Sequence, residues 1–281
     1  MTTRRNFLRV LGACAGVSAG VGFYTFEIEP GWLEIVRRPL PLRRLPPALI
    51  GRTVAHLSDI HIGPMVSDDY VLDTFRRVAA LKPDIVVITG DLMSWCQGWR
   101  DHVAAVYREV PRGRLATIAS LGNHDYGPGW RDHAIGDSLA DVLRSCGITV
   151  LRNQMLDVEG LQIVGLDDLW AKRFNPGQVL PTLDPSRAAI ALSHNPDTAD
   201  LPVWGNFEGW ILAGHTHGGQ CKPPFLPPPV LPVRNRRYTS GEFQLAGNRR
   251  LYISRGVGHT VPVRFNVRPE ATLFDLQGTN G

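Results

Sequence analysis

The chain has 281 residues, of which 43% are hydrophobic, so it can bury a substantial core without disulfides or a structural metal. Its four cysteines are scattered and show no Cys-x-x-Cys spacing, which argues against a disulfide framework and leaves the cellular compartment open. The formal net charge of +4 suits anionic partners such as phosphates or lipid headgroups, although it is also ordinary for an arginine-rich protein.

The first predicted element is an export leader over residues 1–28. Arg4-Arg5 precedes Phe7-Leu8, and an uncharged segment then runs from Val10 to Phe26. This pattern is similar to a twin-arginine signal, so the export machinery is an expected partner. The apolar segment is at the short end of the roughly 17–25 residues that span a bilayer, and both a cleaved signal and a retained anchor fit it. We therefore expect a periplasmic or cell-envelope protein, on the outer face of the cytoplasmic membrane if anchored.

A junction rich in proline and arginine is expected over residues 29–48. Its prolines prevent a long helix. Trp32, beside basic residues, suits a bilayer interface, and a solvated linker explains the same composition equally well. The body is predicted to cover residues 49–277.

The body alternates strands and helices. Helical spacing follows Ser67-Asp68-Asp69 and stops at Lys82-Pro83, and a second helix is expected from Asp132 to Cys146. This alternation predicts an α/β core in which loops at the carboxyl ends of strands form the site. A proline-rich loop after His217, followed by strand-like sequence, predicts a second sheet.

Five of the predicted strands end in residue types that bind metals. The strands are expected at residues 53–57, 85–89, 116–120, 189–192 and 210–213, and the motifs that follow them are Asp59-x-His61, Gly90-Asp91, Gly122-Asn123-His124-Asp125, Ser193-His194-Asn195 and Gly214-His215-Thr216-His217. Any one of these residues alone is more often a turn former or a structural histidine. Five ordered motifs together favour a metal site. By contrast, His56 lies within a strand and is expected in the core, and Asp167-Asp168 is expected to form a strand-ending turn, with a substrate-binding pair as the alternative.

The residue types also indicate the chemistry of the site. Asp59 and His61 are two residues apart, so in an extended chain both can reach one metal. Asp91 carries two carboxylate oxygens and can bridge two cations, whereas Asn123 offers a neutral oxygen. Nitrogen and oxygen ligands without thiolate favour Mn, Fe or Zn.

In their order, these motifs resemble the calcineurin-like metallophosphoesterase superfamily over roughly residues 49–277. The resemblance implies a four-layer α/β sandwich of two mixed β-sheets flanked by helices. It also implies two divalent metal ions. Asp59, His61, Asp91 and His217 would hold one ion, and Asp91, Asn123, His194 and His215 would hold the other.

The implied function is a phosphodiesterase that uses a metal-bridging hydroxide as its nucleophile. His124 is expected to give a proton to the leaving oxygen, with Asp125 orienting it. The substrate is then a phosphate ester, and a narrower resemblance to exported, membrane-associated bacterial phosphodiesterases suggests a lipid-linked one. The alternatives are a pyrophosphatase of a nucleotide-linked lipid precursor (UDP-diacylglucosamine type) and a non-catalytic metal-binding scaffold. No aromatic-basic stripe is evident, so no specific nucleic acid partner is expected.

Overall fold

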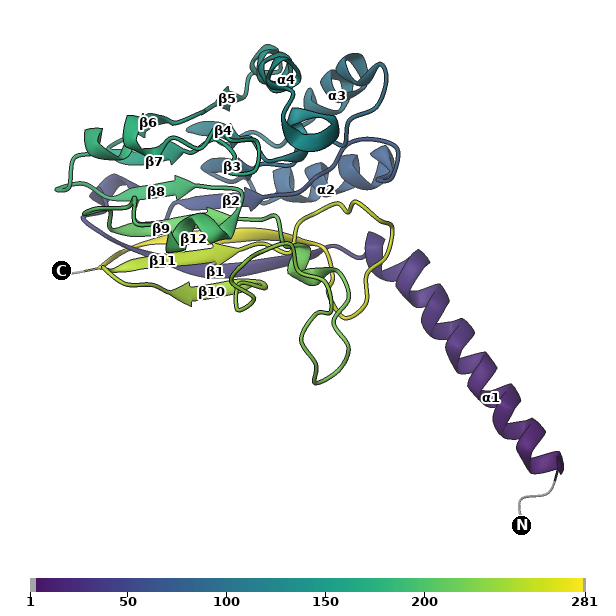
Figure 1. Cartoon of the computed structure of the whole chain (residues 1–281). Helices are drawn as coiled ribbons and strands as arrows, with labels where there is room; N and C mark the ends of the chain where they lie inside the picture. The colour runs from purple at the N-terminus through teal and green to yellow at the C-terminus, as the bar shows by residue number, and fades with distance from the viewer. Residues whose placement is uncertain (1–3, 280–281) are drawn as a thin grey trace.

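Two six-stranded mixed sheets form the body of the protein. The computed structural model describes residues 4–279 (Figure 1). The first sheet has the order β1-β12-β2-β3-β4-β5, and the second has the order β10-β11-β9-β8-β7-β6. The bounds in the first sheet are β1 Glu34–Arg43, β12 Glu270–Thr279, β2 Thr53–Leu57, β3 Ile85–Thr89, β4 Ala116–Ser120 and β5 Thr149–Val150. Those in the second are β10 Gly241–Gln244, β11 Arg249–Ile253, β9 Gly209–Ala213, β8 Ala189–Leu192, β7 Leu161–Gly165 and β6 Gln154–Val158.

The core lies in three layers. Strand side chains such as Val54, Ile163 and Trp210 pack between the sheets. The outer face of the first sheet packs against α2 (Asp68–Ala80), α3 (Trp99–Tyr107) and α4 (His133–Ser145). The outer face of the second sheet packs against loops and short 3-10 turns, with Trp204 and Phe207 in that core. The expected two mixed sheets with flanking helices are confirmed, and the fourth layer consists of 3-10 turns and loops.

Local sequence explains the helix ends. At the start of α4 the Asp132 side chain accepts hydrogen bonds from the backbone N–H groups of Ala134 and Ile135, which have no partner within the helix. The helix α2 carries Asp68 and Asp69 in its first turn, where acidic groups stabilise the positive end of the helix dipole. Both helices begin and end within a residue or two of the expected positions.

The segment predicted as a junction is in fact part of the first sheet. Strand β1 lies within residues 29–48 and pairs in parallel with β12, from Glu34 opposite Glu270 to Arg43 opposite Thr279. The expectation of a linker or bilayer-interface segment therefore does not describe residues 34–43. Pro39 and Pro41 are tolerated because β1 is an edge strand, where a missing N–H leaves no neighbouring strand unpaired.

The N-terminal helix α1 (Arg4–Phe23) projects from the body (Figure 1). By length and composition, residues Asn6–Gly31 are long and apolar enough to cross a membrane, and no part of that segment's most apolar window is buried. The chain after α1 is fixed to the body, because the buried Glu29 carboxylate accepts hydrogen bonds from the backbone N–H groups of Asn266 and Val267.

Candidate metal centre

The carboxyl ends of five strands from both sheets meet at one place. Asp59 and His61 follow β2, Asp91 follows β3 and Asn123 follows β4, all in the first sheet. The second sheet supplies His194 after β8, and both His215 and His217 after β9. All seven side chains are buried. Their convergence follows from the topology, because parallel strands end at the same edge of a sheet.

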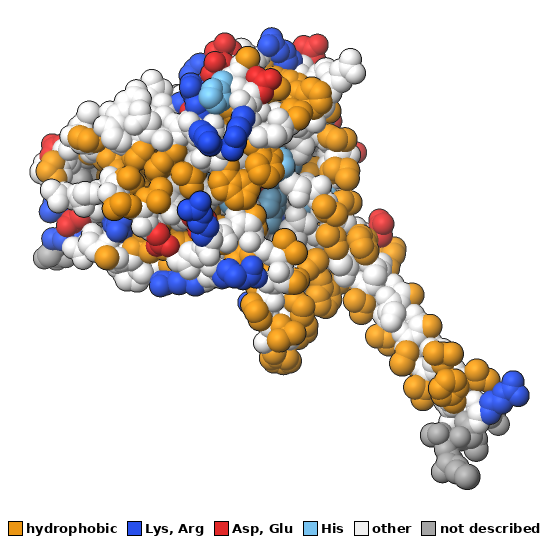
Figure 2. Space-filling model, viewed as in Figure 1, with side chains coloured by type: hydrophobic (Ala, Val, Ile, Leu, Met, Phe, Trp, Pro, Cys, Tyr) orange, Lys and Arg blue, Asp and Glu red, His pale blue; other side chains and the backbone are white. Residues whose placement is uncertain are grey.

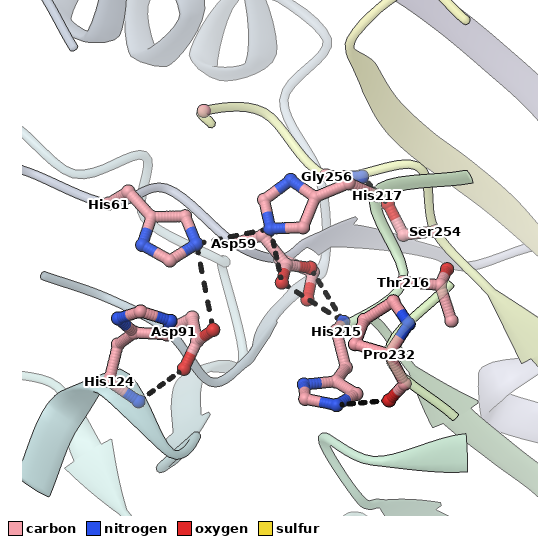
Figure 3. A network of polar contacts seen from close by, with 12 residues as sticks. Asp59, His61, Asp91, His124, His215, Thr216, His217, Pro232, Ser254 and Gly256 are labelled. Carbon is pink, nitrogen blue, oxygen red and sulfur yellow. Dashed lines mark hydrogen bonds and ion pairs between the residues drawn. The ribbon is translucent and has the colours of Figure 1, made fainter. Parts of the chain in front are cut away.

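Six of these residues form two groups of ligand atoms that share one carboxylate. The first group is Asp59, His61, Asp91 and His217, and the second is Asp91, His194 and His215. Within each group, one ligand atom per residue lies within 4.8 Å of the others. The Asp91 Oδ2 atom is 3.5 Å from His61 Nε2 (Figure 3) and 3.2 Å from His194 Nε2, so it lies between the groups.

Asn123 brings a neutral oxygen to the same place. Among the described residues, its buried Oδ1 atom has no hydrogen-bond donor. A buried polar atom without a partner is costly, and a cation would satisfy it. The donor set of carboxylates, imidazoles and one amide oxygen fits divalent metal ions.

The histidine rings present their inner nitrogens to the centre. His194 Nδ1 donates to the Thr89 carbonyl at 2.7 Å, which leaves Nε2 facing Asp91. His215 Nε2 donates to the Pro232 carbonyl at 2.9 Å, which leaves Nδ1 facing inward. Outer hydrogen bonds of this kind fix the ring orientation and the tautomer of a metal-binding histidine.

The charge of the centre also favours a cation. Burial lowers the pKa of His61 and of His215 to about 3, so both rings are neutral and offer a lone pair. Burial would lower the pKa of His194 too, but Asp91 and the nearby Asp59 and Asp168 raise it to about 10. The negative charge that favours a proton on His194 favours a divalent cation in its place.

The backbone of the centre has an uncommon conformation. Five of the seven ligand-type residues have a left-handed φ, between 49° and 70°. They are Asp59, His61, Asp91, His215 and His217. The loops also approach closely, since a Cβ added to Gly122 would lie 2.4 Å from both the N and the Oδ1 atoms of Asp91. Uncommon backbone conformations of this kind cluster at functional sites.

His124 lies where the sequence placed it, and Asp125 has a different role. The His124 ring is 4.9 Å from the His61 ring, and its backbone N–H donates to Asp91 Oδ1 at 2.8 Å (Figure 3). The expectation that Asp125 orients His124 has no contact to support it among the described residues. Both Asp125 oxygens accept backbone N–H groups, from Leu92 and Met93 on one oxygen and from Gly122 on the other.

One cavity opens onto the centre, and a second lies near it. A cleft of about 380 Å³ is lined by Asp91 and His124 and also by Val230 and Val261. A second cavity of about 920 Å³ is lined by Trp130 and Trp170 and by the cations Arg131, Lys172 and Arg234. Trp170 separates this cavity from the centre, because its ring packs edge-on against His215 at 4.4 Å and stacks on Trp130 at 5.0 Å.

Sequence reasoning missed several residues around the centre. Ser94, Thr89 and Pro232 hold the outer nitrogens of the ligand histidines, and their sequence carries no signal for that role. Asp168 was expected in a strand-ending turn, with a substrate-binding pair as the alternative. It is buried, its Oδ2 atom has no hydrogen-bond partner among the described residues, and its charge raises the pKa of His194. Its position shortly after the buried strand β7 was the available signal. His56 is buried and bonded to Thr89, as expected for a core residue.

Comparison with known proteins agrees with this geometry. A family model described as calcineurin-like phosphoesterase matches residues 52–219. The chain is 32% identical to phosphodiesterase YaeI of Escherichia coli (strain K12), over 98% of this chain and 100% of that protein. It is 33% identical to the uncharacterized metallophosphoesterase YkuE of Bacillus subtilis (strain 168), over 99% of each chain. UDP-2,3-diacylglucosamine pyrophosphatase LpxG of Chlamydia trachomatis is more distant, at 25% identity over 88% of this chain and 90% of that protein.

Proposed function

The chain belongs to the calcineurin-like phosphoesterase family and is a metal-dependent phosphoester hydrolase, and we propose that it is a phosphodiesterase with two divalent metal ions at the buried centre. The observation that carries the proposal is the Asp91 carboxylate, which belongs to both groups of ligand atoms. One shared carboxylate between two sets of imidazoles and carboxylates suits a pair of cations better than a single one.

The proposed ligands follow from the two groups. Asp59, His61, Asp91 and His217 would hold one ion, and Asp91, Asn123, His194 and His215 the other. Bound divalent cations activate water and neutralise the negative charge that develops on a phosphoryl group. The nitrogen and oxygen donors favour Mn, Fe or Zn.

His124 is the proposed proton donor to the leaving oxygen. It lines the cleft beside Asp91, and its ring lies 5.6 Å from the ring of Trp130 at the second cavity. Its ring therefore stands between the ligand atoms and the space that a leaving group would occupy. Proton transfer by a positioned side chain typically contributes about 10²–10⁴ in rate.

The two cavities favour a diester. A phosphodiester carries two substituents on its phosphorus, and two cavities lie near His124, which lines the cleft and has its ring 5.6 Å from the ring of Trp130 in the second cavity. A monoester would fill only one of them. A pyrophosphatase of a nucleotide-linked lipid precursor remains the second candidate, because LpxG carries that activity in its name.

For the location, we propose export by the twin-arginine route and residence in the periplasm or cell envelope. The Arg4-Arg5 pair and the apolar helix α1 support this proposal. A reporter fused to the carboxyl end tests it. A cytoplasmic reporter would contradict export and would favour the nucleotide-linked substrate, which is made on that side.

The test of the activity is a metal-titrated assay of the full chain with diester, monoester and pyrophosphate substrates. We expect diester cleavage that is lost on chelation and restored by Mn. Asp91→Asn should lower turnover by at least about a hundredfold. Asp84→Asn is the matched control, because Asp84 precedes β3 and Asp91 follows it. Turnover of Asp91→Asn within about threefold of the parent would refute the role of Asp91, and equal rates on monoesters would make the enzyme a phosphatase.

A further inference from the structure

Four apolar side chains stand out from the surface beside the cleft, and we call them the apolar rim. Phe225, Leu226 and Val230 lie in the loop between β9 and β10, and Val261 lies in the loop between β11 and β12. Phe225 is 105% exposed and Val230 is 72% exposed. Figure 2 shows hydrophobic side chains gathered on a protrusion of the same end of the molecule from which α1 extends. Exposed apolar clusters of this kind mark contact sites.

The loop that carries the rim is held in place by the body. The Arg234 N–H donates to Asp197 Oδ2 at 2.8 Å, and within the loop Arg236 Nη2 donates to the Pro228 carbonyl at 3.1 Å. The loop also folds back onto Gly219, whose φ is +83° and where an added Cβ would lie 2.2 Å from Pro228 Cβ. The protrusion is therefore a fixed feature of the fold.

The rim is tied to the base of α1 through one short segment, residues 264–267. The Arg264 N–H donates to the Thr25 carbonyl at 3.0 Å, and Glu29 accepts the N–H of Val267 at 2.6 Å. On its other side the segment pairs with the stem of the rim loop, where the Lys222 N–H donates to the Phe265 carbonyl at 2.8 Å. The apolar rim and the apolar helix therefore have a fixed position relative to each other.

The surroundings of the rim are basic. No acidic residue occurs between Glu208 and Glu242, whereas this stretch contains four exposed cations, Lys222, Arg234, Arg236 and Arg237. At the base of α1 the half-exposed Trp32 ring lies 4.2 Å below the Arg268 guanidinium. Tryptophan and arginine beside an apolar segment are typical of the headgroup region of a bilayer, and clustered cations attract anionic lipids.

The rim also forms one wall of the cleft. Val230 and Val261 line it together with Asp91 and His124, so an apolar chain that follows the rim leads to the metal centre. We propose that the apolar rim enters the same phospholipid bilayer as α1, and that the cleft there takes the phosphodiester of a membrane lipid. Docking stands independently, and the choice of substrate rests on the proposed function. In the reaction, water adds to phosphorus, one P–O ester bond breaks and the leaving oxygen takes a proton, which yields an alcohol and a phosphomonoester.

Docking is tested with the full chain in vesicles of phosphatidylcholine and phosphatidylglycerol that contain a lipid with a photoreactive acyl chain. Mass spectrometry should find lipid adducts in residues 223–231 as well as in α1. In the double variant Phe225→Ser/Leu226→Ser the loop adducts should disappear while those in α1 persist. Adducts confined to α1 in the parent protein would overturn the proposal. Dimers in detergent that the double variant converts to monomers, without loop adducts, would also overturn it and assign the rim to a second copy of the chain.

The substrate is tested by comparing phosphatidylglycerol in vesicles with the soluble diester bis(p-nitrophenyl) phosphate. The double variant should lose at least about tenfold on the vesicle lipid and stay within about twofold on the soluble diester, because it removes two apolar side chains that would enter the bilayer. Ile50→Ser is the matched control, since Ile50 is as exposed as Leu226 but precedes β2, whereas the centre follows β2. It should change neither rate.

The outcomes separate the two proposals. If the parent protein cleaves neither diester with Mn present, the proposed function fails, and the adducts still decide docking. If it cleaves only the soluble diester, the lipid substrate is wrong. An equal loss on both substrates in the double variant would show that the rim supports the cleft itself, which would overturn its role as a bilayer contact.

Discussion

At the scale of single residues, the centre combines backbone conformations of high free energy with buried charged groups. A left-handed φ costs a non-glycine residue about 1–3 kcal/mol, and five of the proposed ligands adopt it. Hydrogen bonds hold these residues in position, as where the His215 N–H donates to both Asp59 oxygens at 3.0 and 3.1 Å. The free energy of the surrounding buried strands therefore maintains an arrangement that the residues themselves disfavour.

His124 should affect turnover without affecting metal binding. We expect His124→Ala to lower the diester turnover by about 10²–10⁴, because it removes the proposed proton donor. The rise in melting temperature on adding Mn should remain, since the side chain is in neither group of ligand atoms. His102→Ala, on the half-exposed face of α3, is the control. Loss of the Mn-induced shift in His124→Ala would assign the ring to metal binding instead.

Replacing Asp125 should mainly lower the stability of the folded protein. An amide in place of the carboxylate in Asp125→Asn would bring an NH₂ group against at least one of the three backbone N–H donors. We expect a loss of about 1–3 kcal/mol in the free energy of unfolding, because a buried donor loses its acceptor. Thermal unfolding checks this. An unchanged melting temperature with lost activity would restore the catalytic role that the sequence suggested.

Sequence indicated the ligand-type residues that the structure brings together, but not the partners of Asp125. A residue that follows a strand end faces the site wherever the strands converge, so the five motifs could be read from local patterns. His124 and Asp125 lie in a single 3-10 turn, where successive side chains point about 120° apart. The two side chains therefore face different partners, since Asp125 binds backbone N–H groups, and this local conformation was not evident from the motif.

At the scale of elements, short and irregular pieces were the ones that sequence reasoning missed. The helix α3 has nine residues and begins after Gly98, which has a φ of +74° and no capping side chain. It lacks the start signal that Asp132 gives to α4. Strand β1 carries two prolines, which are compatible with a strand only at the edge of a sheet, and that position depends on β12 far along the chain.

The stability that the contacts at the start of β3 provide should depend on pH. The buried Asp84 carboxylate accepts hydrogen bonds from the Thr53 N–H and from Arg52 and Arg114. Burial would raise the pKa of Asp84, but these partners hold it below its ordinary value of 3.8. The stabilisation that the Asp84 carboxylate gives to the folded state is therefore fully present above the unfolded-state pKa. It is lost as the pH falls through the lower folded-state pKa.

Asp84→Asn should consequently destabilise the protein by about 1–3 kcal/mol at neutral pH, because it weakens hydrogen bonds to charged groups. Urea unfolding of parent and variant at about pH 7 and about pH 3.5 measures the difference. The difference should shrink at the lower pH. A gap that stays constant would mean that the carboxylate charge is not responsible.

At the scale of the whole molecule, the centre joins the two sheets, since the first supplies Asp59, His61, Asp91 and Asn123 and the second supplies three histidines. A metal bound there would crosslink the halves of the sandwich. Both cavities are likewise built from segments distant in sequence, such as Trp130, Trp170 and Arg234. The sequence therefore predicted the type of reaction. It did not predict which substrate fits, because the shape of the cavities depends on how distant loops pack.

Metal removal should therefore lower global stability. A metal ion at a concentration about a hundredfold above its dissociation constant stabilises a folded protein by about 2.7 kcal/mol. For a chain of this size we expect chelation to lower the melting temperature by roughly 5–10 °C, and Mn to restore it. Asp91→Asn should not respond to Mn, whereas Asp84→Asn should respond like the parent. A parent protein indifferent to chelation would contradict metal binding at the centre.

The pairing of β1 with β12 determines when the first sheet can be completed during synthesis. Among the strands of residues 4–279, β1 has β12 as its only neighbour in the sheet, and that partner ends at residue 279. At about 5–20 residues per second, a ribosome needs roughly 10–50 s after making β1 to finish β12. For that interval α1 has already emerged, while the strand that joins it to the body is unpaired. The native sheet can close only after β12 has been made, so a membrane pathway that accepts the folded body must act after that point in synthesis.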